Sequence, residues 1–194
     1  MADEKTQAAK TEDRRVRRTK KLLQQGLTEL MERKPVKDIT VRELADLTDL
    51  NRGTFYMHYR DVFDMLEQME QELFAQFDSL LASHEGDRLS EEAFPLLRDL
   101  FGFIGENAAF CRAMLDGNGD MTFLLRLNDV LKNRCLRDWM MARSREDKNR
   151  FDYSYAFAVY GCAGMIRDWL NKGMPESPDR LAEIAAHMIQ HGAV

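Results

Sequence analysis

Residues 52–60, RGTFYMHYR, concentrate side chains that can form hydrogen bonds with a ligand. The stretch holds two arginines, two tyrosines, a threonine and a histidine, with a glycine where a helix should begin. An arginine guanidinium can donate two parallel hydrogen bonds to O6 and N7 of guanine, and hydroxyl groups donate well to phosphate oxygens. A purely structural exposed helix would be richer in Glu, Lys and Ala. The pattern therefore predicts contact with nucleic acid.

Other residues with reactive or metal-binding groups form no comparable pattern. DGNGDM, from Asp116, has the acidic spacing of a calcium loop, but that loop needs glycine at position 121 and glutamate at 127, where Met121 and Leu127 stand. The histidines and cysteines outside the stretch show no ligand spacing: His84, His187, His191, Cys111, Cys135 and Cys162. We expect no metal, no cofactor and no catalytic residues.

Two short helices joined by a tight turn must position the polar stretch. Thr40, followed by Glu43 three residues later, predicts a capping box at the start of a helix that ends near Thr48. Asn51 is the predicted N-cap of the next helix, over residues 52 to about 59. Two short helices separated by a turn of three or four residues predict a helix-turn-helix.

Helical periodicity along the chain predicts an all-α fold of about nine helices, with no convincing strand. Only four prolines and eleven glycines interrupt the 194 residues. We predict a disordered tail over residues 1–13, a helix-turn-helix domain over 14–60 and a helical body over 61–194. In that body, helices are expected after Asp61, over 90–106, 107–115, 120–143 and 148–172, and after the N-cap Ser177.

Charge is distributed unevenly along the chain, whose net charge is −5. Residues 14–60 hold twelve Lys/Arg against six Asp/Glu, a net of +6, and six of these cations lie in RRVRRTKK. From residue 61 onward, fourteen Lys/Arg face twenty-three Asp/Glu, a net of −9. A basic N-terminal module on an acidic body suits a polyanionic partner that is touched at one end only.

The sequence from about Arg18 to Leu66 resembles the DNA-binding domain of the tetracycline-repressor (TetR/AcrR) family of regulators. The segments that carry the resemblance are RTKKLLQQGLTELM and ITVRELADLTDLNRGTFYMHYRDVFDML. Two later segments, FGFIGEN and YGCAGMIRDWLNKGM, resemble the branch that contains dihydroxyacetone-kinase operon regulators. The resemblance implies base-edge contacts from Arg52, Gly53 and Thr54. It implies phosphate contacts from the following residues: Arg18, Thr19, Thr40, Tyr56, His58 and Tyr59.

The chain departs from the family pattern at two positions. Asp49 stands where the turn usually has glycine, and Asp accepts the left-handed backbone conformation better than most residues. Val62 stands where the fourth helix usually begins with lysine, which removes one cation from the expected phosphate contacts. The basic run over residues 14–21 is expected to compensate electrostatically.

The helical body is expected to bind an effector and to dimerise. Dense aromatic and methionine side chains suit an apolar pocket, although ordinary core packing explains any one of them. The predicted pocket residues are Phe101, Phe103, Phe110, Met114, Phe123, Trp139, Tyr155 and Trp169, with Asn128 and Arg167 as further polar groups that could orient the effector. The predicted dimer interface lies on the last two helices, at Ala156, Gly161, Gly164, Ile184 and Met188.

The predicted function is that of a homodimeric, ligand-responsive transcription regulator that represses by binding a palindromic double-stranded DNA operator. Two alternatives are a helical interaction protein of the same fold without operator binding and an all-α enzyme with an anionic substrate. No apolar run reaches the roughly 18 residues of a membrane span, and the polar start of the sequence lacks the apolar region of a secretory signal. We therefore expect no membrane association, and the cytoplasm as the location.

Overall fold

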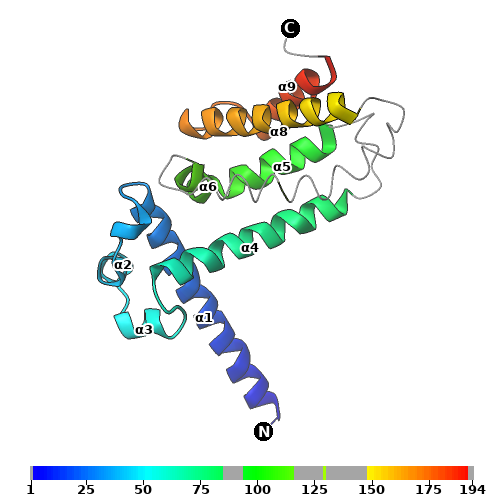
Figure 1. Ribbon diagram of the computed structural model, residues 1–194. Helices are drawn as coiled ribbons and strands as arrows, with labels where there is room; N and C mark the ends of the chain where they lie inside the picture. The colour runs from blue at the N-terminus through cyan, green and yellow to red at the C-terminus, as the bar shows by residue number, and fades with distance from the viewer. Residues whose placement is uncertain (1, 85–93, 116–128, 130–147, 192–194) are drawn as a thin grey trace. The chain divides into compact units, whose positions relative to one another are not determined.

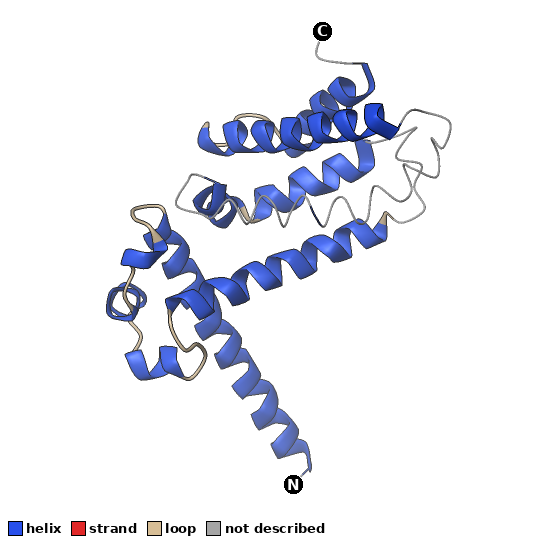
Figure 2. Ribbon diagram, in the orientation of Figure 1, coloured by secondary structure: helices blue, strands red, loops and turns tan. Residues whose placement is uncertain are grey.

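The computed structural model of the protein is helical throughout the part of the chain that it describes, residues 2–84, 94–115, 129 and 148–191 (Figure 1). These residues form eight α-helices and one short 3-10 helix, and Figure 2 shows no strand among them. The predicted all-α fold class is confirmed, and the helix count is close to the expected nine. The helix predicted over residues 120–143 lies outside the described residues.

The helices follow one another in this order: α1 (Ala2–Met31), η1 (Val36–Asp38), α2 (Val41–Thr48), α3 (Arg52–Tyr56), α4 (Val62–Ser83), α5 (Phe94–Glu106), α6 (Ala108–Leu115), α8 (Lys148–Asn171) and α9 (Pro178–His191). The chain divides into two compact units, residues 1–71 and 72–194. The boundary between the two units falls within the residue range of α4. The predicted functional domains, which meet at residues 60 and 61, remain predictions.

α1 begins at Ala2, so residues 2–13 are helical where the sequence analysis expects a disordered tail. The expectation rests on the absence of an apolar stripe. The segment is nevertheless rich in Ala, Glu, Lys and Gln, which favour a helix through their backbone and rotamer preferences alone.

The core of the N-terminal unit is built around the second half of α1. Leu23 and Leu27 lie one helical turn apart and are fully buried, as is Leu44 of α2. α1 and α2 approach each other closely at Gly26, where a Cβ atom would lie 2.5 Å from Cγ2 of Thr48 and 3.0 Å from Cδ1 of Leu44. The absence of a side chain at Gly26 lets α2 settle against α1.

The core of the C-terminal unit forms where α5 packs along α9 and α6 packs against α8. The buried side chains of α5 are Leu96, Leu97, Leu100, Phe101 and Ile104, and those of α9 are Leu181, Ala182, Ala185 and Ala186. Three of the four buried residues of α9 are alanines, so α5 can lie close to its backbone. α9 starts as predicted, with Pro178 as its first residue and Ser177 Oγ accepting a hydrogen bond from the backbone N–H of Arg180 at 3.2 Å.

Candidate nucleic-acid interface

α2 starts with the predicted capping box. The hydroxyl of Thr40 accepts a hydrogen bond from the backbone N–H of Glu43 at 3.2 Å, and the Glu43 carboxylate accepts one from the backbone N–H of Thr40 at 3.0 Å. The hydroxyl also donates to Oε2 of Glu43 at 2.9 Å. Two N–H groups that the helix itself cannot satisfy are thereby satisfied, which fixes where α2 begins.

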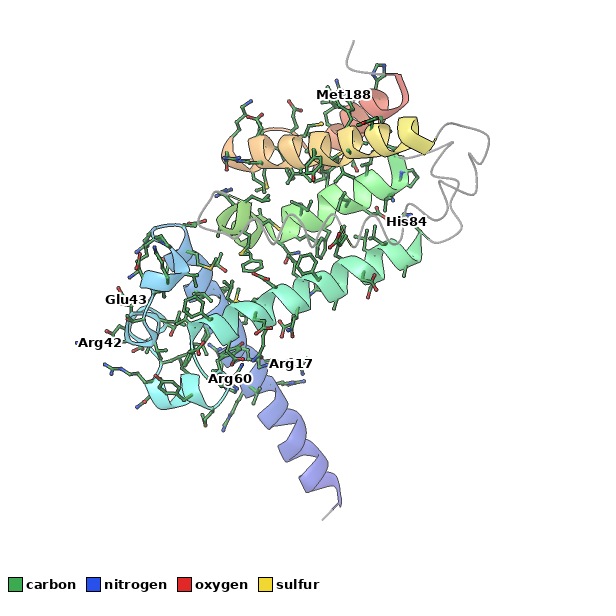
Figure 3. All side chains as sticks on the ribbon, viewed as in Figure 1. Arg17, Arg42, Glu43, Arg60, His84 and Met188 are labelled. Carbon is green, nitrogen blue, oxygen red and sulfur yellow. The ribbon has the colours of Figure 1, made fainter. Side chains whose placement is uncertain are left out.

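An ion pair joins the end of α1 to this cap. Nζ of Lys34 lies 2.6 Å from Oε1 of Glu43. The hydrogen bond from Lys34, followed by those from the side chain and backbone of Thr40, lowers the pKa of Glu43 to about 2. Glu43 therefore serves both the cap of α2 and the link to α1, and Figure 3 shows it at the start of α2 beside Arg42.

The turn between α2 and α3 has the conformation expected from the sequence. Asp49 has φ 54° and ψ 37°, which is the left-handed region, and the next residue, Leu50, donates its N–H to the carbonyl of Ala45 at 3.0 Å. Asn51 then caps α3, because its side chain accepts a hydrogen bond from the N–H of Gly53 at 2.8 Å. α2, this turn and α3 form the predicted helix-turn-helix.

The inner face of α3 is aromatic. Phe55 is 1% exposed and Tyr59, one helical turn later, is 2% exposed, with their ring centroids 5.6 Å apart. Nζ of Lys20 in α1 lies 5.7 Å from the centroid of the Tyr59 ring, within the range of a cation–π contact. These contacts anchor α3 to α1 within the N-terminal unit.

The predicted phosphate contact from Tyr59 does not agree with this burial. α3 ends at Tyr56, but the N–H groups of His58 and Tyr59 still bond to the carbonyl of Phe55, at 2.9 and 3.0 Å. The helical path therefore continues far enough to place Tyr59 on the same face as Phe55. Tyr59 follows the buried Phe55 by four residues, and this spacing is the feature of the sequence that could have predicted its burial.

The outer face of α3 and the turn after it carry five of the other predicted base and phosphate contacts. Arg52, Gly53 and Tyr56 are exposed, and Thr54 and His58 are partly exposed. A Cβ atom at Gly53 would meet only Oδ1 of its own cap residue, at 3.4 Å, so a large ligand can approach the backbone here.

Met57 also lies on this outer face, although the sequence analysis assigned it no role. Its side chain is 73% exposed, more than that of any other apolar residue described in the N-terminal unit. Its backbone stays helical and its N–H donates to the carbonyl of Gly53 at 3.1 Å, so Gly53 and Met57 follow each other along one side of the helix.

The basic residues of α1 lie before its buried part. Arg14, Arg15, Arg17, Arg18 and Lys21 are exposed. The predicted phosphate contact Thr19 is partly exposed between them. Figure 3 shows Arg17 on this segment of α1. The cations therefore stand on the surface of the same unit as α3.

The start of α4 is capped by Asp61, the residue before the position where the family pattern has a lysine. The carboxylate of Asp61 accepts a hydrogen bond from the N–H of Asp64 at 2.8 Å, as the predicted N-cap requires. The backbone N–H and then the guanidinium of Arg60 donate to Asp64, at 2.8 and 3.1 Å, and these bonds lower the pKa of that carboxyl. Val62 is buried, so this position adds to the core and presents no cation to a phosphate.

In the described ranges, no group of three His, Cys, Asp or Glu side chains is placed to hold a metal ion. The same ranges contain no helix that is long and apolar enough to cross a membrane.

Comparison with known families places the chain. Residues 91–191, more than half of the sequence, match the TetR-type family model described as "Transcriptional regulator C-terminal region". The chain belongs to the TetR family of transcriptional regulators. TetR-family regulators bind DNA and are dimers.

A relative of this TetR-family chain is the uncharacterised HTH-type transcriptional regulator YxbF of Bacillus subtilis (strain 168). The two are 24% identical over 169 residues, which cover 83% of this chain and 42% of YxbF. The chain thus spans about two fifths of the length of this curated relative.

Several solved structures share the TetR fold of this chain. The dihydroxyacetone kinase operon activator DhaS is 16% identical, with 88% of this chain and 93% of that chain covered and a TM-score of 0.59. A TetR regulator from Streptococcus agalactiae 2603V is 20% identical, with coverage of 93% and 98% and a TM-score of 0.61. The fatty acid degradation regulator FadR from Bacillus halodurans is 16% identical, with coverage of 90% and 95% and a TM-score of 0.68. At these identities the likeness shows the fold alone.

The predicted effector residues of this TetR-family regulator do not gather around one cavity. An apolar cavity of about 30 Å³ lies in the C-terminal unit, and Phe103 is the predicted residue that lines it. Phe101, Phe110 and Met114 are buried in the core, and Trp169 donates its indole N–H to the carbonyl of Glu176 at 2.9 Å. Phe123, Trp139, Asn128 and the side chain of Tyr155 lie outside the described residues.

The cavity has neighbours that the sequence analysis did not assign to it. Its lining is wholly apolar and also includes Leu73 and Phe77 of α4, Cys111 of α6, and Ala163 and Ile166 of α8. Burial raises the pKa of the Cys111 thiol to about 12. These residues come from four helices, so no single periodic stripe identifies them.

The predicted dimer residues of this TetR-family regulator lie on the outer surface of α8 and α9. Gly161 and Gly164 are exposed, and a Cβ atom at either would meet no other heavy atom within 4 Å. Three exposed aromatic residues, Tyr153, Phe157 and Tyr160, share this side of α8 at helical spacing. Ala156 and Ile184 are half-buried, and Met188 is exposed on α9 (Figure 3).

Proposed function

We propose that this TetR-family regulator is a cytoplasmic homodimer that binds a palindromic DNA operator, represses transcription and releases the operator when a small apolar molecule binds. The observation that carries the proposal is the packing of α3. Phe55 and Tyr59 fix its inner face in the core, which leaves Arg52, Gly53 and Tyr56 on the surface. A helix held in this way can enter the major groove with its polar face toward the bases.

The proposed DNA contacts follow from the position of each side chain. Arg52, Gly53 and Thr54 lie in the first turn of α3 and are assigned to base edges. Phosphate contacts are assigned to the following residues: Arg18, Thr19, Thr40, Tyr56 and His58. Tyr59 is given a different role from the one expected, which is to position α3 through its contacts with Phe55 and Lys20.

The test starts by selecting duplexes that bind the full chain from a random-sequence library. We expect an enriched palindrome whose half-sites are one helical turn, about 34–36 Å, or a multiple apart. Arg52→Ala should weaken binding to this duplex by about 1–3 kcal/mol per half-site. Its binding to random DNA should stay almost unchanged. Arg98→Ala, which removes a cation from α5, is the matched control and should bind as the wild type does.

Each alternative function predicts a different result of this selection. A helical interaction protein of the same fold would enrich no duplex. An enzyme with an anionic substrate would also enrich no duplex, and it would turn over its substrate. If Arg52→Ala weakened binding to enriched and to random DNA equally, Arg52 would contact only phosphate. This result would contradict its assignment to a base edge.

The proposed homodimer rests on the exposed side of α8 and α9. Tyr153, Phe157 and Tyr160 are large apolar groups in contact with solvent, and Gly161 and Gly164 leave room beside them for a second helix. Burying such a patch against its copy removes apolar surface from water, and the small residues allow the two backbones to come close. Two linked copies of α3 can then bind two half-sites at once.

The proposed effector site is the apolar cavity of the C-terminal unit, enlarged on binding. Ligand pockets usually measure about 300–1,000 Å³, so the observed 30 Å³ must open for a molecule to enter. An effector releases DNA only if it binds the DNA-free conformation more tightly, typically by about 1–3 kcal/mol. FadR of Bacillus halodurans is named for fatty acid degradation, which makes unbranched acyl chains the first class to titrate.

The effector is tested by titrating fatty acids and other apolar metabolites while operator release and tryptophan fluorescence are recorded together. Ala163→Phe fills the cavity and should abolish release, because Ala163 lines it. Ala186→Phe enlarges a buried alanine of α9 away from the cavity lining and controls for disturbance of the core. If only divalent metals or phosphorylated compounds act, an apolar site is the wrong assignment. A reporter gene downstream of the operator distinguishes repression from activation.

A further inference from the structure

Met57 is an apolar side chain placed where the recognition helix should be polar. It is 73% exposed in a segment whose other exposed members are arginine, glycine and tyrosine. Its backbone is ordinary right-handed helix, with φ −71° and ψ −19°, so its exposure is not a consequence of an irregular chain. Nothing in the packing of the N-terminal unit explains a methionine here.

Met57 follows α3 directly as its C-cap, and its helical backbone points its side chain away from the core. Successive residues of a helix are about 100° apart, so positions two before and two after a given residue lie roughly opposite it. Relative to the buried Phe55, those positions are Gly53 and Met57. Gly53 has no side chain, and only Met57 therefore extends from the face directly opposite the core.

The neighbours of Met57 show what it can touch. Tyr56 is exposed on one side and His58 is half-buried on the other, and both are suited to phosphate oxygens at the edges of a groove. Met57 stands between them and can bond to neither phosphates nor polar base edges. The apolar feature on the floor of the major groove is the 5-methyl group of thymine.

We propose that Met57 recognises the methyl group of one thymine in each operator half-site. The inference rests on the proposed function, since it requires that α3 enter the major groove. The thioether side chain is flexible and polarisable, so it can adjust to a methyl group whose position varies with the local shape of DNA. Gly53, one turn before, lets the helix backbone come close enough for this contact.

The experiment combines a change in the protein with a change in the DNA. The duplex selected by the wild-type chain is synthesised with each thymine in turn, together with its symmetry mate, replaced by deoxyuridine, which lacks only the methyl group. Affinities of the wild type and of Met57→Ala are measured for every duplex. At one thymine per half-site, replacement by deoxyuridine should lower the affinity of the wild type for the duplex about four-fold per half-site. This factor corresponds to the free energy of burying one methyl group. The same replacement should leave Met57→Ala unchanged.

Three controls make the result decisive. Phe63→Ala removes another exposed apolar side chain of the same unit and should keep the full deoxyuridine effect. Met57→Leu keeps an apolar side chain and should keep most of it. The thermal midpoint of Met57→Ala should equal that of the wild type, because the side chain is mostly in solvent.

Three outcomes overturn the proposal. If Met57→Ala weakens all duplexes equally, or if the deoxyuridine effect persists in this variant, Met57 does not read the methyl group. If no duplex is enriched in the selection, the proposed operator binding fails, and this inference fails with it. Enrichment without coupling between Met57 and a thymine refutes the present inference alone.

Discussion

The backbone at Asp49 shows how one residue sets the geometry of the helix-turn-helix. Its φ of 54° is unfavourable for a residue with a Cβ atom, and among non-glycine residues Asp and Asn tolerate it best. The conformation lets the N–H of Leu50 bond to the carbonyl of Ala45 and turns the chain toward the cap of α3. The family's usual glycine would adopt the same turn without the steric conflict.

Asp49→Gly should therefore stabilise the protein by about 1 kcal/mol, the approximate penalty of a left-handed non-glycine residue. The midpoint of urea unfolding at constant slope measures this change. Asp46→Gly, in the interior of α2, is the matched control and should destabilise by a few tenths of a kcal/mol, because glycine disfavours a helix slightly more than aspartate does. A loss of stability in Asp49→Gly would show that the carboxylate makes a contact that offsets the strain.

Capping residues and the residues that face the core differ in how well the sequence predicts them. Thr40, Asn51 and Ser177 were correctly assigned as caps, because a cap depends on side chains and N–H groups two or three positions apart. The burial of Tyr59 was not predicted, because the direction of its side chain depends on whether the helical path continues beyond Tyr56. Tertiary contacts with Phe55 and α1 decide that, and they are not local in the sequence.

At the scale of elements, α1 and α2 pack through a shared apolar core and a close contact at Gly26, and an ion pair links the turn after α1 to the cap of α2. Lys34 and Glu43 connect the end of α1 to the cap of α2, and Gly26 lets the two helices touch. The position of α3 depends on α2 through the turn at Asp49. A change at Gly26 or Lys34 should therefore alter the proposed DNA binding, although neither residue is assigned to DNA.

The ion pair predicts a dependence of stability on pH. The pKa of Glu43 is about 2 in the folded protein and 4.5 ordinarily, so its ionised form favours folding. This contribution is complete above about pH 4.5 and is lost as the pH falls toward 2. The difference in unfolding midpoint between the wild type and Glu43→Gln should shrink across this window. Asp46→Asn, four-fifths of a turn later on α2, should show no comparable change; an equal change would assign the effect to general charge.

The close contact at Gly26 predicts a destabilising substitution. In Gly26→Ala the new methyl group would lie 2.5 Å from Cγ2 of Thr48, whose hydroxyl is bonded to the carbonyl of Leu44 at 2.7 Å and resists rotation. Overpacking of about 1–3 kcal/mol should exceed the helix preference for alanine of about 1 kcal/mol. Thermal unfolding should show a lower midpoint for this variant.

Gly102→Ala supplies the matched control for this contact. Gly102 lies inside α5, and a Cβ atom there would meet no other heavy atom within 4 Å. The helix preference should act alone and raise the midpoint. If Gly26→Ala also raises it, α1 and α2 can separate more easily than their contact suggests.

At the scale of the whole molecule, the proposed dimer depends on surface residues that take no part in the core. The periodic stripes of the last helices predict their buried sides, such as Trp169 and Leu181, because burial of apolar residues repeats with the helix. The apolar cavity of the C-terminal unit was not predictable in this way, since it forms where four helices meet. Only Phe103, among the described residues expected there, lines it.

The exposed side of α8 predicts the result of a single substitution. Gly164→Arg places a long charged side chain between two copies of the helix and should convert dimers into monomers of 22.6 kDa, as measured by light scattering. Operator affinity should fall with dimerisation, because two half-sites are no longer bound together. Gly102→Arg is the same change at another open position, on α5, and should remain dimeric. A dimeric Gly164→Arg would place the interface on another surface.

The reactivity of the buried Cys111 thiol in the cavity wall should report how often the surrounding helices open. With a pKa of about 12, Cys111 is ionised at pH 7 in roughly one molecule in 10⁵, so it should resist oxidants and alkylating reagents while the fold is closed. Modification must then wait for the surrounding helices to part. The rate at which a small maleimide labels Cys111 therefore measures how often these openings occur. The labelling rate of Cys162, which is only partly buried, serves as the comparison. A molecule bound in the cavity would slow the labelling of Cys111 and leave the labelling of Cys162 unchanged.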